Sequence, residues 1–67
     1  MDKETIKAFI LWLESASLEE IENRKNEFKD TALAVSSHEA KSDIRLGLRL
    51  IDEELIARLE LNQAHTK

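Results

Sequence analysis

Two residue types that often stabilise or shape small domains are missing: the 67 residues include no cysteine and no proline. Without cysteine the chain can form no disulfide bond and no thiolate metal site. A chain of this length buries only about 60% of the surface that its unfolded form exposes, so a single copy is expected to be marginally stable. Regular helix packing, oligomerisation or both must then supply the missing stability.

The chain also lacks long apolar segments and an excess of positive charge. Its longest apolar run, Ala8 to Leu13, is far shorter than the ~20 residues of a membrane span. The opening residues have neither the positively charged region nor the cleavage site of a signal peptide. The formal net charge of −4 argues against a nucleic-acid-binding protein held by bulk charge. We therefore expect a cytoplasmic protein without a membrane segment.

The chain is rich in good helix formers, chiefly Leu, Glu, Ala, Lys and Ile. Two Ser-x-x-Glu patterns, from Ser17 to Glu20 and from Ser36 to Glu39, are capping boxes that mark helix starts. Helical periodicity predicts three helices with short connections, over residues 3–14, 18–35 and 37–64. Short connections favour antiparallel neighbours. The expected fold is a single all-α domain over residues 1–67, a three-helix unit in which the second and third helices form a hairpin closed by the short first helix.

The apolar residues of the predicted helices divide into stripes on a helical wheel. The second helix has one stripe, which is typical of a helix with a single buried side. The third helix has two stripes that lie nearly opposite each other, and the first helix is apolar nearly all round. The predicted core takes one stripe from each helix: Ile6, Phe9, Ile10, Leu13, Leu18, Ile21, Phe28, Ala32, Val35, Ile44, Leu48, Ile51, Leu55 and Leu59.

The second apolar stripe of the third helix has no partner within a three-helix unit. A contiguous apolar patch of this kind is uncommon on a monomer. The third helix is also longer than the second, so its last turns should extend beyond the hairpin. We expect this stripe and the outer side of the first helix to form a self-association surface, with a homodimer favoured over a different protein partner. Its residues are Leu11, Trp12, Leu46, Leu50, Ala57 and Leu61.

Gly47 is the only glycine, and it lies in the middle of the predicted third helix. Glycine in a helix interior costs about 1 kcal/mol relative to alanine. Because apolar residues flank it on the wheel, the position indicates a close approach between two helices.

A basic stripe follows one flank of the third helix, where Lys41, Arg45 and Arg49 are spaced four residues apart. One interpretation is a flank that is solvated or paired with acids of the second helix, such as Glu22. The other is a contact with an acidic partner or with phosphates. A helix-turn-helix over residues 31–48 would place the stripe on DNA, although the turn lacks a glycine. A small DNA-binding regulator is therefore the alternative to a protein-interaction module.

The sequence contains no catalytic or metal-binding pattern. His38 and His65 have no second histidine at helical spacing, and zinc sites take three or four ligands. The acidic run at residues 52–54 is placed for ion pairs with Arg49 and Arg58 along the helix. No nucleophile and base are arranged for covalent catalysis. The sequence thus predicts a binding protein without enzymatic activity or cofactor, acting as an adaptor, regulator or inhibitor.

Overall fold

The computed structural model describes the backbone of residues 2–65 and the side chains of residues 2–61. Three helices make up the fold: α1 (Lys3–Ser15), α2 (Leu18–Ala34) and α3 (His38–His65). No strand occurs within the described backbone. The predicted all-α, three-helix class is confirmed, and every helix boundary lies within one residue of its predicted position.

Side chains cap the helices where the sequence supplies them. Asp2 Oδ1 accepts a hydrogen bond from the Thr5 amide at 2.8 Å. The predicted capping box of α2 is present, since Ser17 Oγ accepts from the Glu20 amide and Glu20 Oε1 accepts from the Ser17 amide. The hydrogen bond from the Ser17 backbone, helped by its hydroxyl, lowers the pKa of Glu20 below its ordinary value. The hydrogen bonds from Thr5, with its side chain as the larger cause, likewise lower the pKa of Asp2.

The start of α3 differs from the predicted Ser36 capping box. The hydroxyl of Ser37 accepts the hydrogen bond from the Ala40 amide at 3.4 Å, and the Ser37 carbonyl accepts from the Lys41 amide. The cap therefore lies one residue later than predicted. Either serine can supply a capping hydroxyl, and the structure uses Ser37 although only Ser36 is followed three residues later by a glutamate.

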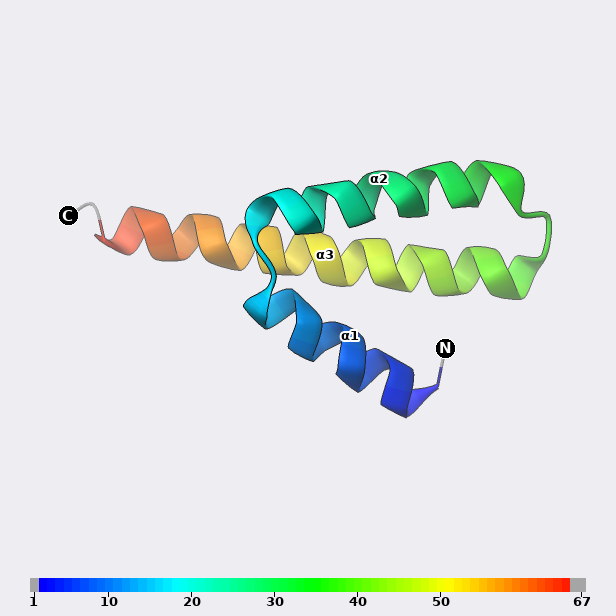
Figure 1. Ribbon diagram of the computed structural model, residues 1–67, viewed down its shortest axis with the longest axis horizontal. Helices are drawn as coiled ribbons and strands as arrows, with labels where there is room; N and C mark the ends of the chain where they lie inside the picture. The colour runs from blue at the N-terminus through cyan, green and yellow to red at the C-terminus, as the bar shows by residue number, and fades with distance from the viewer. Residues whose placement is uncertain (1, 66–67) are drawn as a thin grey trace.

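The helices form an antiparallel hairpin with an oblique third member (Figure 1). α2 and α3 pack along most of the length of α2, as predicted. α1 meets α3 near its own C-terminal end and diverges from it toward its N-terminus, while the last turns of α3 extend beyond both other helices. The molecule measures 46 × 24 × 16 Å and has a radius of gyration of 13.3 Å. A compact domain of this length would have a radius of gyration of about 11 Å, so the shape is open.

The core is small and lies where the three helices meet. Its buried apolar residues are Leu13, Ala16, Ile21 and Ile51, with Phe9, Trp12, Phe28, Leu50 and Leu55 packed against them. Three residues that the wheel assigned to the core are exposed instead: Ile10 by 38%, Leu18 by 53% and Leu59 by 59%. Leu18 is the first residue of α2, and Leu59 lies in the C-terminal part of α3, which extends beyond the other two helices (Figure 1).

The predicted close approach at Gly47 is confirmed. A Cβ built on Gly47 would overlap Phe28 Cε2 and lie 3.0 Å from Phe28 Cδ2. The Phe28 ring stacks on Phe9 with 5.7 Å between centroids, and Phe9 stacks on Trp12 at 5.8 Å. A row of three aromatic rings thus connects α2 to α1, with one ring seated directly on the α3 backbone.

Candidate interaction surfaces

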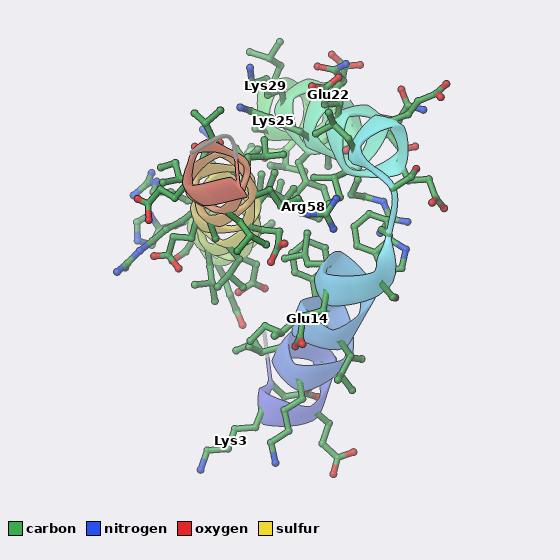
Figure 2. All side chains as sticks on the ribbon, turned by 90° about the vertical axis from the view of Figure 1, so that its left-hand side faces the viewer. Lys3, Glu14, Glu22, Lys25, Lys29 and Arg58 are labelled. Carbon is green, nitrogen blue, oxygen red and sulfur yellow. The ribbon has the colours of Figure 1, made fainter. Side chains whose placement is uncertain are left out.

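Arg58 attaches α1 to α3. Its Nη2 donates to the carbonyl oxygens of Leu13 and Ala16, at 2.7 and 2.8 Å, and its Nε donates to Glu54 Oε2 at 2.8 Å. Figure 2 shows the Arg58 side chain reaching from α3 into the space between α1 and α2. The last carbonyls of a helix have no partner within it, so one guanidinium satisfies acceptors at the end of α1 while its charge is balanced by Glu54.

A shallow hollow of about 240 Å³ lies between the diverging helices α1 and α3. Apolar side chains from both helices line it, with two carboxylates at its side: Ile10, Leu13, Leu50, Glu53 and Glu54. Both carboxylates are ion-paired along α3, Glu53 with Arg49 at 3.3 Å and Glu54 with Arg58 at 2.8 Å. Because their charges are balanced locally, the hollow presents an apolar surface with neutralised edges.

The six predicted self-association residues occupy two kinds of position. Leu11 and Leu61 are exposed by 66% and 62%, and Ala57 is also exposed. Leu46, Leu50 and Trp12 are half-buried. Leu50 joins the predicted surface to the core and lines the hollow. Trp12 packs against the core, and the Arg24 guanidinium carbon lies 4.7 Å from its ring centroid in a cation–π contact.

The wheel did not identify Ile10 as part of this surface. It placed Ile10 in the core because Ile6, Ile10 and Leu13 share one face of α1. Ile10 lies at the edge of that face where α1 turns away from α3, which leaves its side chain 38% exposed beside Leu50. The crossing angle of the two helices decides this, and no local pattern in the sequence encodes that angle.

The basic stripe is exposed, and its members differ in their partners. Arg49 Nε pairs with Glu53 on the same helix at 3.3 Å. Neither Lys41 nor Arg45 is in an ion pair among the residues whose side chains are described. The ion pair that links α2 to α3 runs instead between Lys25 Nζ and Asp52 Oδ1, at 2.9 Å. Among the described side chains no member of the stripe pairs with an acid of α2, and all three are exposed to solvent.

A second hollow, of about 280 Å³, lies beside these two basic residues. It is lined by Ala32 of α2 and by Lys41, Ile44, Arg45 and Leu48 of α3. Arg45 is about 140° around α3 from Leu50 at 100° per residue, so the two hollows face different sides of the helix.

The described part of the chain offers no metal-binding cluster of three or more His, Cys, Asp or Glu side chains. The side chain of His65 lies outside the described residues. None of the helices has an apolar stretch long enough to cross a membrane, within the residues searched. Comparison with protein family models, with curated proteins and with solved structures gave no match.

Proposed function

We propose that the chain is a small non-enzymatic protein-interaction module, an adaptor, regulator or inhibitor of the cytoplasm, that forms a homodimer through the apolar surface of α1 and α3. The observation that carries the proposal is the area left uncovered. One copy exposes 5288 Å², whereas a compact monomer of 7.7 kDa exposes about 4,300 Å². The excess is about 1,000 Å².

A second copy matches this excess in size. Stable protein interfaces bury about 800 Å² on each partner. Covering such an area would bring the chain to the surface of an ordinary compact protein of its mass. Most dimers are built on a two-fold axis, which pairs one patch with its own copy, so a single apolar surface is sufficient.

The residues proposed for this surface come from α1 and α3. Leu50 of α3 and Ile10 of α1 line the hollow between the two helices, and Leu46 lies one helical turn before Leu50 on the same side of α3. Ala57 and Leu61 continue the same side of α3 into its extension at helical spacing. Leu11 and Trp12 extend the surface onto α1. In an antiparallel pair of α3 helices, the extension of one copy would cover the hollow of the other.

Size-exclusion chromatography with light scattering, over a dilution series, tests the proposal. The wild-type chain should show twice its 7.7 kDa mass at high concentration and approach the monomer mass on dilution. Leu61→Glu should shift the sample toward the monomer without loss of helicity, because this side chain is 62% exposed and supports no core contact.

Leu33→Glu is the matched control. Leu33 is 89% exposed and belongs to α2, which contributes no residue to the proposed surface, so its substitution should leave the mass unchanged. Leu50→Glu should act like Leu61→Glu but can also disturb the core, and its helicity must be measured beside its mass. A wild type that is monomeric at every concentration, or a Leu61→Glu mass equal to that of the wild type, would contradict the proposal.

A further inference from the structure

The hollow of about 280 Å³ beside Lys41 and Arg45 combines an apolar floor with a basic edge. Ala32, Ile44 and Leu48 supply the floor and are only half-buried, so apolar surface remains open between α2 and α3. Lys41 and Arg45 stand one helical turn apart along α3 and are both exposed. An apolar strip flanked by a row of like charges is the complement of one face of an amphipathic helix.

The positive charges of Lys41 and Arg45, which form the edge of this hollow, are not balanced by an ion pair with any described side chain. Arg49 and Arg58 on the same helix are held by Glu53 and Glu54, whereas Lys41 and Arg45 have no ion-pair partner among the described side chains. The molecule as a whole is acidic, with a formal net charge of −4. Two adjacent unpaired cations on an acidic protein create a local positive field that attracts a negatively charged ligand.

The apolar floor decides which negatively charged ligand fits. Nucleic acids are held by a track of several Lys and Arg side chains along the phosphates, and this edge supplies two cations, Lys41 and Arg45, that have no ion-pair partner among the described side chains. Phosphates and sugars would also leave the open part of the floor, formed by Ala32, Ile44 and Leu48, without an apolar partner. We propose that this hollow binds an amphipathic helix of another protein, whose apolar residues contact the floor and whose acidic flank pairs with Lys41 and Arg45.

The distance between Lys41 and Arg45, one helical turn, predicts how far apart the acidic residues of the partner helix should be. A helix lying along the groove between α2 and α3 would place apolar side chains three or four residues apart over the floor. Carboxylates one turn apart on its flank would then reach Lys41 and Arg45 together. The site lies on a different side of α3 from the proposed self-association surface, so neither contact requires the other.

Two synthetic helical peptides of about 18 residues test the charge requirement. Both carry leucine at the same helical positions; one has glutamate on the flank and the other has lysine. Fluorescence anisotropy with the full-length chain should show the glutamate peptide binding at least about tenfold more tightly, with an affinity that falls as salt is added. Equal binding of the two peptides would overturn the proposal.

Substitutions on the same helix locate the site. Arg45→Glu should weaken binding of the glutamate peptide at least about tenfold. Arg49→Glu makes the same change of charge one turn further along, at a residue that does not line the hollow, and should weaken binding by about threefold or less. Similar losses for both variants would show general charge attraction and would overturn the assignment to the hollow.

Two further measurements separate this site from other occupants. Tighter binding of a duplex DNA of about 20 base pairs than of the peptide, lost in Arg45→Glu, would identify a nucleic-acid site and overturn the proposal. A reduced solution mass of Arg45→Glu would identify a second copy as the occupant. Leu61→Glu, which is designed to break self-association, should bind the peptide with unchanged affinity, so failure of the homodimer and failure of the peptide site give different results.

Discussion

Gly47 and Phe28 form the tightest contact between α2 and α3. Gly47 has no positive φ angle, so its role is to leave space for the ring and not to permit an unusual backbone. The Phe28 ring is also stacked on Phe9 and cannot easily move away. Glycine at this position costs the helix about 1 kcal/mol relative to alanine, and the aromatic packing that it allows offsets that cost.

Substitution of Gly47 tests this balance. Gly47→Ala should lower the free energy of unfolding by about 1 kcal/mol, because overpacking costs more than the gain in helix propensity. Gly47→Leu should cost about 3 kcal/mol or more. Urea unfolding followed by circular dichroism measures both.

The same alanine substitution in a Phe28→Leu background provides the control. There the ring is absent, and Gly47→Ala should stabilise the chain. A stabilising Gly47→Ala in the wild-type background would show that Phe28 moves freely and that the contact is not tight.

At the scale of helices, α1 is attached differently from α2. α2 packs on α3 along most of its length, whereas α1 meets α3 near one end, through Leu13, Ala16 and the hydrogen bonds of Arg58. The row of Phe9, Trp12 and Phe28 provides the other connection. The docking of α1 is consequently expected to be the least stable part of the fold.

Arg58→Lys should loosen α1 selectively. An ammonium group on a flexible stem cannot donate to two carbonyls and a carboxylate in the fixed geometry of a guanidinium. We expect a loss of about 1–2 kcal/mol, seen as amide hydrogen exchange in α1 that is about tenfold faster while exchange in the α2–α3 hairpin changes less.

Arg49→Lys is the comparison for that experiment. Arg49 makes an exposed ion pair with Glu53 and has no described contact with α1, so its substitution should change stability by less than about 0.5 kcal/mol. Equal effects of the two substitutions on α1 would show that Arg58 does not hold this helix in place.

For the molecule as a whole, the small core and the large exposed area imply that a single copy has a low free energy of unfolding. In the described part of the chain, the apolar residues that a single copy buries are Leu13, Ala16, Ile21 and Ile51, and one copy exposes 5288 Å². Such a core supplies little stability to a domain of this size. Under the proposed function, much of the stability comes from association.

Stability should therefore depend on protein concentration. Because association stabilises a monomer that is itself folded, each tenfold increase in concentration should add up to about 1.4 kcal/mol to the apparent free energy of unfolding, and the urea midpoint should rise accordingly. The Leu61→Glu variant should have a midpoint that is lower and independent of concentration. A wild-type midpoint that does not move with concentration would show that a single copy is stable by itself.

The sequence by itself determined the helices of this protein. Capping residues, the distribution of helix formers and the 3.6-residue periodicity are local properties, and they predicted the three elements, the hairpin and the ion pairs of Arg49 and Arg58 along α3. Periodicity also identified Gly47 as a close contact. These features depend on residues within a few turns of one another.

Only the tertiary structure decided where α1 lies and which apolar side chains its position leaves exposed. The angle at which α1 leaves α3 exposes Ile10 and creates the hollow beside Leu50, although the wheel places Ile10 with buried Leu13. The link from Arg58 to Ala16 spans 42 residues of sequence. Crossing angles and long-range hydrogen bonds arise from the packing of all three helices together, so no local pattern contains them.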